Sequence, residues 1–183
     1  MTLEHRLALL ISVLLTTLAT LLPSTVWGQA STQQQTLLPF AAAITGVPTE
    51  TARAGTHYVP VYMQLPVGAG AINVNLSVTL SVRNTSPDSV IAIRNVNFYD
   101  TNGALLQPFL LSPIGIRPYG TVNFFVSVLD QRGGSGGNFI VEWEGAASAS
   151  EPVVEAIMLG DVGGRAYSFI SRGIETTRRS ETR

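Results

Sequence analysis

The sequence predicts an all-β fold of two antiparallel layers, preceded by an N-terminal signal helix. The clearest evidence is residues 73–83, NVNLSVTLSVR, where polar and apolar side chains alternate strictly, as on a half-buried strand. Further apolar runs follow after residue 84, and turn-forming residues separate them. No stretch after the signal has a convincing helical period, so strands are expected to build the whole core.

An export signal opens the chain. An uncharged apolar run begins at Leu7, directly after Arg6, and ends at Leu22. A cationic start, an apolar core of about 15 residues and a small residue at the cut are typical of secretory signals, whereas a membrane span needs about 20 apolar residues. Residues 1–28 are therefore predicted to be a signal peptide, or an uncleaved anchor in the inner membrane. Either outcome places the remaining chain in the periplasm or outside the cell.

The rest of the chain divides into three segments. Residues 29–55 lack sustained periodicity and are predicted to be a flexible linker, whereas residues 175–183 are predicted to be a disordered tail. Residues 56–174 are predicted to form the sandwich. Its expected strands begin near residue 57 and continue over residues 73–83, 90–99, 104–111, 122–128, 139–143, 153–159 and 167–171.

The strand over residues 73–83 needs a second layer to cover its apolar face. Burying five apolar side chains contributes about 7–15 kcal/mol, whereas fixing nine backbone units costs about 9–18 kcal/mol. Other strands must therefore pack on it. The short strands and the turns between them favour an immunoglobulin-like sandwich.

Two local features of the strand over residues 90–99 are also predicted. Its apolar positions change phase between Ile93 and Val96, which indicates a bulge near Arg94. The sequence DTNG at residues 100–103 is typical of a turn, because Asp and Asn bond their own backbone and Gly accepts a positive φ.

Composition excludes several chemistries. The chain has no Cys, which removes disulfides and thiolate sites. His57 is the only histidine beyond the signal, too few for most zinc enzymes, and is predicted to be an ordinary surface or strand-end residue. There is no Lys, the net charge is -1 and the Arg residues are scattered, so nucleic-acid binding is not expected. No metal and no cofactor are predicted.

Short motifs in a fixed order resemble a known family. They are YVPVY at residues 58–62, TLSVRNT at 79–85, YD at 99–100, GGSG at 133–136, NF at 138–139, VEW at 141–143, EAIM at 155–158, SF at 168–169 and SRG at 171–173. Together they resemble a bacterial exported family known as domain of unknown function 3124, over residues 58–173. The resemblance implies an envelope or periplasmic location and no particular reaction, ligand or catalytic residue.

A glycine-rich loop is the first candidate binding site. Its candidate residues are Gly133, Gly134, Ser135, Gly136 and Asn138. A phosphate-binding loop would need a following Lys and a helix, but no Lys follows and the next segment is predicted to be a strand. The glycines are expected to permit a hairpin with positive φ, and the loop remains a candidate for contact with a partner.

Two carboxylates and one arginine complete the candidates. Glu142 and Glu144 are expected on one face of a strand, about 6.5 to 7 Å apart, within the range used by inverting glycosidases. The simpler interpretation is an inward Trp143 flanked by two solvated carboxylates. Arg172 is expected to pair with Glu142 or Glu155 across neighbouring strands, or to remain an unpaired surface residue.

The favoured hypothesis is a non-enzymatic exported module that binds an envelope protein or glycan, with no catalytic residue. One alternative is a carboxylate-based glycan hydrolase that uses Glu142 and Glu144. A pocket joining both to His57 or Arg172 would favour this enzyme. A second alternative is a membrane-tethered structural spacer.

Overall fold

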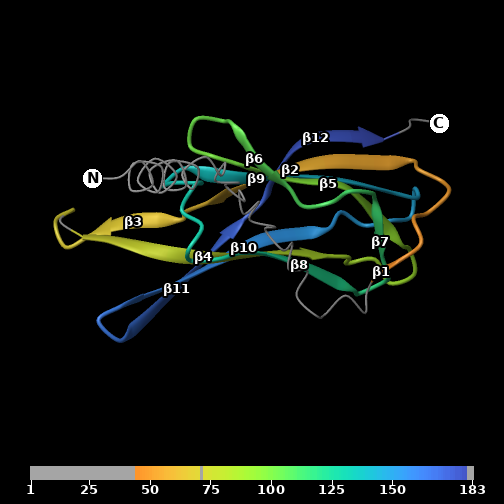
Figure 1. The fold of residues 1–183 in the computed structure, drawn as a ribbon. Helices are drawn as coiled ribbons and strands as arrows, with labels where there is room; N and C mark the ends of the chain where they lie inside the picture. Colours follow the sequence, from red (N-terminus) through yellow and green to blue (C-terminus); the bar gives the residue numbers. More distant parts are fainter. Residues whose placement is uncertain (1–43, 71, 181–183) are drawn as a thin grey trace, which may run out of the picture. The chain divides into compact units, whose positions relative to one another are not determined.

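The structure, a computed structural model, describes residues 44–70 and 72–180, and the predicted signal peptide lies outside this part of the chain. Two antiparallel sheets pack face to face as a β-sandwich (Figure 1). One sheet has the strand order β1 (Ile44–Thr45), β7 (Ile114–Ile116), β5 (Ile91–Tyr99), β9 (Gly137–Gly145), β2 (Arg53–Val61) and β12 (Ile174–Ser180), with β6 (Leu105–Pro108) beside β5. The other has the order β11 (Arg165–Arg172), β10 (Val153–Val162), β4 (Ile72–Arg83) and β3 (Gln64–Val67), with β8 (Thr121–Val126) beside β4.

The described residues confirm the predicted all-β sandwich, while its immunoglobulin-like connectivity stays a prediction. Within residues 44–180, residue 71 aside, no helix is long and apolar enough to cross a membrane.

The core lies between the two sheets. All five predicted apolar positions of β4 are buried, namely Val74, Leu76, Val78, Leu80 and Val82. Phe139 of β9 lies at the centre of an aromatic cluster, 5.0 Å from the ring of Phe98 and 5.7 Å from that of Phe109. Phe109 in turn contacts Phe124 of the opposite sheet at 5.7 Å. Because the cluster joins both layers, it fixes how the sheets pack.

Both local predictions for the strand over residues 90–99 are confirmed. The pairing between β5 and β9 shifts register between Ile93 and Asn95, as a bulge at Arg94 requires. In the turn that follows, the Asp100 carboxylate accepts hydrogen bonds from the backbone of Asn102 and Ala104, each 2.8 Å long. Gly103 has a φ of 81°, so the glycine is needed where the chain reverses.

The predicted linker is wrong at residues 44–45 and 53–55, and the predicted tail is wrong at residues 175–180. Residues 44–45 form β1 and residues 53–55 begin β2, whereas residues 29–43 lie outside the described part. Residues 175–180 are not a disordered tail but belong to β12, which pairs with β2. Residues 181–183 are not described. The inward positions at the start of β2 and in β12 are glycine or polar, so neither strand shows an alternation of apolar residues.

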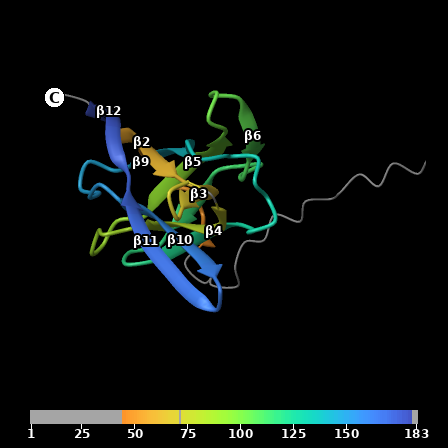
Figure 2. The same ribbon diagram turned by 90° about the vertical axis from the view of Figure 1, so that its left-hand side faces the viewer.

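One glycine carries the chain from one sheet to the other. β11 belongs to the five-stranded sheet and β12 to the seven-stranded sheet, and only Gly173 separates them (Figure 2). Its backbone N–H donates to Val154 O at 2.8 Å, and a Cβ there would lie 3.0 Å from Val59 Cγ2. Strands that switch sheets in this way form the corners of sandwiches.

Candidate functional site

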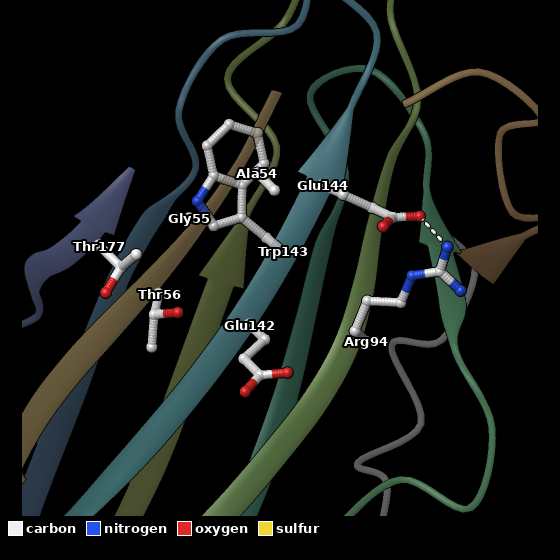
Figure 3. Close-up of a pocket in the computed structure, with 8 residues that line it drawn as sticks. All are labelled: Ala54, Gly55, Thr56, Arg94, Glu142, Trp143, Glu144 and Thr177. Atoms are coloured by element: carbon white, nitrogen blue, oxygen red, sulfur yellow. Dashed lines mark ion pairs between the residues drawn. The ribbon is translucent and has the colours of Figure 1, made fainter. Parts of the chain in front are cut away.

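The candidate site lies on β9, in the middle of the seven-stranded sheet. Trp143 points into the core and is 2% exposed, whereas Glu142 and Glu144 extend from the opposite face of the strand (Figure 3). This arrangement follows from the period of two in VEWE. The prediction that both carboxylates share one face is therefore confirmed.

The bulge in β5 supplies partners for both carboxylates. Ile93 pairs with Trp143 and Asn95 with Glu142, so Arg94 is the extra residue. Arg94 forms an ion pair with Glu144, and the Asn95 Nδ2 donates to Glu142 Oε2 at 2.5 Å. The hydrogen bond and the charge of Glu144 raise the pKa of Arg94 above its ordinary value. Arg94 thus remains cationic, and its charge balances that of Glu144.

The expectation of two solvated carboxylates is wrong for Glu144. Its residue is only 9% exposed, because it lies between β2 and β5, opposite Ala54 and Ala92. Small neighbours on both sides allow the carboxylate to lie close to the sheet, with Arg94 over it.

A pocket of about 250 Å³ opens beside these groups. β2 contributes Thr56 and Gly55 to its lining, and β12 contributes Thr177 (Figure 3). Together with Glu142, Glu144 and Arg94, the pocket offers carboxylate acceptors, a guanidinium donor and hydroxyl groups that do both. Such a mixture can hydrogen-bond a neutral polar ligand from several sides.

A buried donor without a partner also borders this pocket. No described group accepts a hydrogen bond from Trp143 Nε1. A Cβ on Gly55 would lie 2.6 Å from Nε1 and would collide with Glu175 Oε1, which also has no hydrogen bond within the described structure. Gly55 therefore leaves room for the indole N–H and the carboxylate oxygen, and both atoms are buried.

His57 is not the surface residue that the sequence predicts. It is 2% exposed in the middle of β2, and its Nε2 lies 3.2 Å from Glu151 Oε1. The other oxygen of Glu151 lies 2.7 Å from Arg178 Nη2, and Arg178 also pairs with Glu175 of its own strand at 2.5 Å. This network ties β12 to the loop before β10, and His57 does not line the pocket.

The glycine-rich loop is not a hairpin. It connects β8 of one sheet to β9 of the other, so it crosses between layers. The Thr101 hydroxyl donates to Gly133 O at 2.9 Å and accepts from Gly136 N at 3.1 Å, and a Cβ on Gly133 would lie 2.6 Å from Phe98 Cζ. Close packing against the turn at residues 100–103 explains these glycines.

The loop candidates lie apart from the pocket lining. Only Gly134 of the loop has a positive φ, of 66°. Ser135 is exposed, and Asn138 is already within β9, paired with Pro60 and Tyr99. None of Gly133, Gly134, Ser135, Gly136 and Asn138 lines the pocket beside Glu142.

Of the two alternatives for Arg172, pairing with Glu142 or Glu155 is wrong. Arg172 lies opposite Glu155 in the register of β10 and β11, but the carboxylate of Glu155 lies 3.2 Å from Arg83 Nη2 instead. Glu142 belongs to the other sheet. Within the described residues Arg172 makes no ion pair, as the alternative of a surface residue predicts.

An ion pair in the loop after β8 gives a pH-dependent prediction. Arg132 holds Asp130 through Nε at 2.8 Å and Nη2 at 2.7 Å, and these bonds lower the pKa of Asp130. Because the folded pKa is lowered, the stabilisation is present above the ordinary value of about 3.9 and is lost as the pH falls through the folded value. Asp130→Asn should reduce the free energy of unfolding by up to about 1 kcal/mol at neutral pH. Urea unfolding at about pH 7 and about pH 2 measures the difference, which should vanish in acid.

The control is Asp88→Asn, which changes an exposed carboxylate that accepts a hydrogen bond from the neighbouring Ser89 hydroxyl and has no arginine partner among the described residues. It should behave like the parent at both pH values. A destabilisation of Asp130→Asn that persists in acid would contradict a role for the ion pair.

Sequence reasoning missed several residues of the site. The sequence predicts a strand start at Thr56 and a tail at Thr177, and it assigns neither residue a role. Arg94 can be found from the sequence, because the change of phase that predicts the bulge also marks the residue that has no partner in the strand pairing. Among the described residues, no group of three or more His, Asp and Glu could hold a metal ion.

Comparison with known proteins gives one family and one structure. The family model described as "Protein of unknown function (DUF3124)" matches residues 54–176, which confirms the resemblance and widens it slightly at both ends. No curated protein matches the chain. The crystal structure of Thermotoga maritima 1070 aligns over 66% of this chain and 92% of its own, with 11% identity and a TM-score of 0.39.

Proposed function

This chain belongs to the DUF3124 family, and from its own residues we propose that it is an exported, immunoglobulin-like recognition module that binds an envelope glycan without turning it over. The binding surface is the pocket formed by Glu142, Glu144, Arg94, Thr56 and Thr177. Export rests on the signal predicted over residues 1–28, whose cleavage would release the sandwich outside the cytoplasm.

The support for a glycan is the mixture of polar groups around one shallow pocket. Sugar hydroxyls both donate and accept, so they can bond the carboxylate of Glu142 and the guanidinium of Arg94 at the same time. The indole of Trp143 adds apolar surface to the lining.

The support for binding without catalysis is that both carboxylates already have partners. Hydrolysis of glycosides needs one carboxyl group as a general acid and the other as a base or nucleophile. Here Glu144 is paired with Arg94, and Glu142 accepts from Asn95. The pocket also lacks His57 and Arg172, the groups whose presence would have favoured an enzyme.

The proposal predicts a defined loss of glycan affinity. Glu142→Gln keeps the size of the side chain but replaces one acceptor oxygen with a donor. We expect it to weaken binding of the purified chain to envelope oligosaccharides at least tenfold, about 1.4 kcal/mol. A panel of bacterial-envelope oligosaccharides would identify the probe, and isothermal titration calorimetry would measure the affinity.

Glu155→Gln is the matched control, because it changes a half-buried glutamate of the other sheet whose carboxylate likewise has a side-chain partner, Arg83. Binding that Glu142→Gln leaves intact, or that both variants weaken equally, would contradict the pocket. Release of shorter sugars during incubation, seen by mass spectrometry, would favour the hydrolase instead. A mature N-terminus that still contains residues 1–28 would favour the tethered spacer.

A further inference from the structure

The inner face of the five-stranded sheet extends beyond the seven-stranded sheet that covers it. At the left of Figure 1, β3, β4 and the hairpin of β10 and β11 reach past the strands of the upper layer. The side chains on this inner face are apolar, yet Ile72 is 58% exposed, Tyr167 51% and Val67 37%. This end of the sandwich therefore has an apolar surface over which no second layer lies within residues 44–180, residue 71 aside.

The uncovered end is hollowed into a groove of about 280 Å³. Its lining consists of aliphatic side chains from β3, β4 and β10, with Tyr167 and Phe169 from β11. Gly160 lies between Leu76 and Tyr167 in the sheet register, and a Cβ there would lie 3.1 Å from Val74 Cγ1. The absence of a side chain at this position helps to keep the sheet surface concave.

One positive charge stands at the end of this groove. Arg165 pairs in register with Val162, which lines the groove. It shares a strand face with Tyr167, two residues and about 7 Å away. Arg165 is exposed, and its guanidinium forms no ion pair or hydrogen bond with any described residue. Asp161, the nearest acid in sequence, belongs to the alternate face of β10, and residues 62–77 contain no acid at all.

We propose that this groove binds the acyl chain of a fatty acid, with its carboxylate at Arg165. The apolar lining fits the chain, and the single unpaired guanidinium fits a carboxylate, which it can bond in a bidentate way. The volume of the groove is roughly twice that of a cavity of about 150 Å³ that holds benzene. The groove can therefore hold one acyl chain of medium length. The site is separate from the glycan pocket and does not depend on it.

The test compares decanoate with decanol, which have the same chain length but differ in charge. Affinity is measured by displacement of a dansylated undecanoic acid from the purified full chain. Arg165→Glu should weaken decanoate binding at least tenfold and change decanol binding less than twofold. Val162→Glu places a charge in the lining and should weaken both ligands at least tenfold.

Arg172→Glu is the matched control, because it lies on the same strand, is also exposed and belongs to the opposite face. It should leave both affinities unchanged. Circular dichroism and thermal melting confirm that each variant is folded. Equal effects of Arg165→Glu and Arg172→Glu would overturn the proposal, as would a failure of decanoate to bind. A dimer in sedimentation that dissociates only in Val162→Glu, with no decanoate binding, would assign the groove to a second copy of the chain.

Discussion

Replacing Phe139 with alanine is expected to lower the free energy of unfolding by about 3–5 kcal/mol. The ring is fully buried, and it contacts Phe98 of the neighbouring strand and Phe109, which packs on Phe124 of the other sheet. Removing it therefore leaves a cavity that rigid rings on both sides cannot close. The loss is a large fraction of the 5–15 kcal/mol by which a domain of this kind is stable. Equilibrium unfolding in urea, with an unchanged m-value, measures it.

Leu111→Ala is the control for this change, because Leu111 is 92% exposed. It should alter the free energy of unfolding by less than about 0.5 kcal/mol. A cost for Phe139→Ala below about 1.5 kcal/mol would mean that the sheets are not packed through this aromatic cluster.

Truncation after Gly173 is expected to destabilise the sandwich by about 2–4 kcal/mol. It removes β12, whose Glu175 and Thr177 lie against Gly55 and the indole of Trp143. Exposing about half of the roughly 200 Å² that an indole buries costs about 2.5 kcal/mol. The truncation also deprives Glu151 of its bond from Arg178. Thermal and urea unfolding of the shortened chain measure the loss.

The matched control removes only residues 181–183 and should unfold like the parent. This pair of truncations distinguishes a paired strand from a disordered tail, because a disordered tail contributes nothing to the free energy of unfolding. Equal stability of the two shortened chains would show that β12 is not paired with β2 in solution.

Much of the fold is predictable because its strands obey a simple rule. In β4 and the second half of β9, inward positions are apolar and outward positions polar, and in β8 only Phe125 departs from this pattern, so periodicity finds both the strand and its buried face. The bulge at Arg94 is visible for the same reason, since one extra residue shifts the phase. The start of β2 and all of β12 escape the rule. Their inward positions include Gly55, His57 and Glu175, which pack on an indole or pair with charges from distant segments.

The candidate site is predictable only in part. Alternation places Glu142 and Glu144 on one face of β9 without knowledge of neighbouring strands. Their partners come from β5, and the hydroxyl groups of Thr56 and Thr177 come from β2 and β12. Sheet neighbours distant in sequence are not encoded in any local pattern. The burial of Glu144 and the position of the pocket can therefore be predicted only once the fold is known.

The crossing at Gly173 has a consequence for the order in which the protein matures. Of the described strands, β11 and β12 come after all the others in sequence, and each completes a different sheet, so neither sheet has its full set of described strands until these two have been delivered. A protein that is exported through a translocon must stay unfolded until it has crossed the membrane. In the exported chain proposed above, dependence on these two late strands would delay premature folding inside the cell and let assembly finish at the destination.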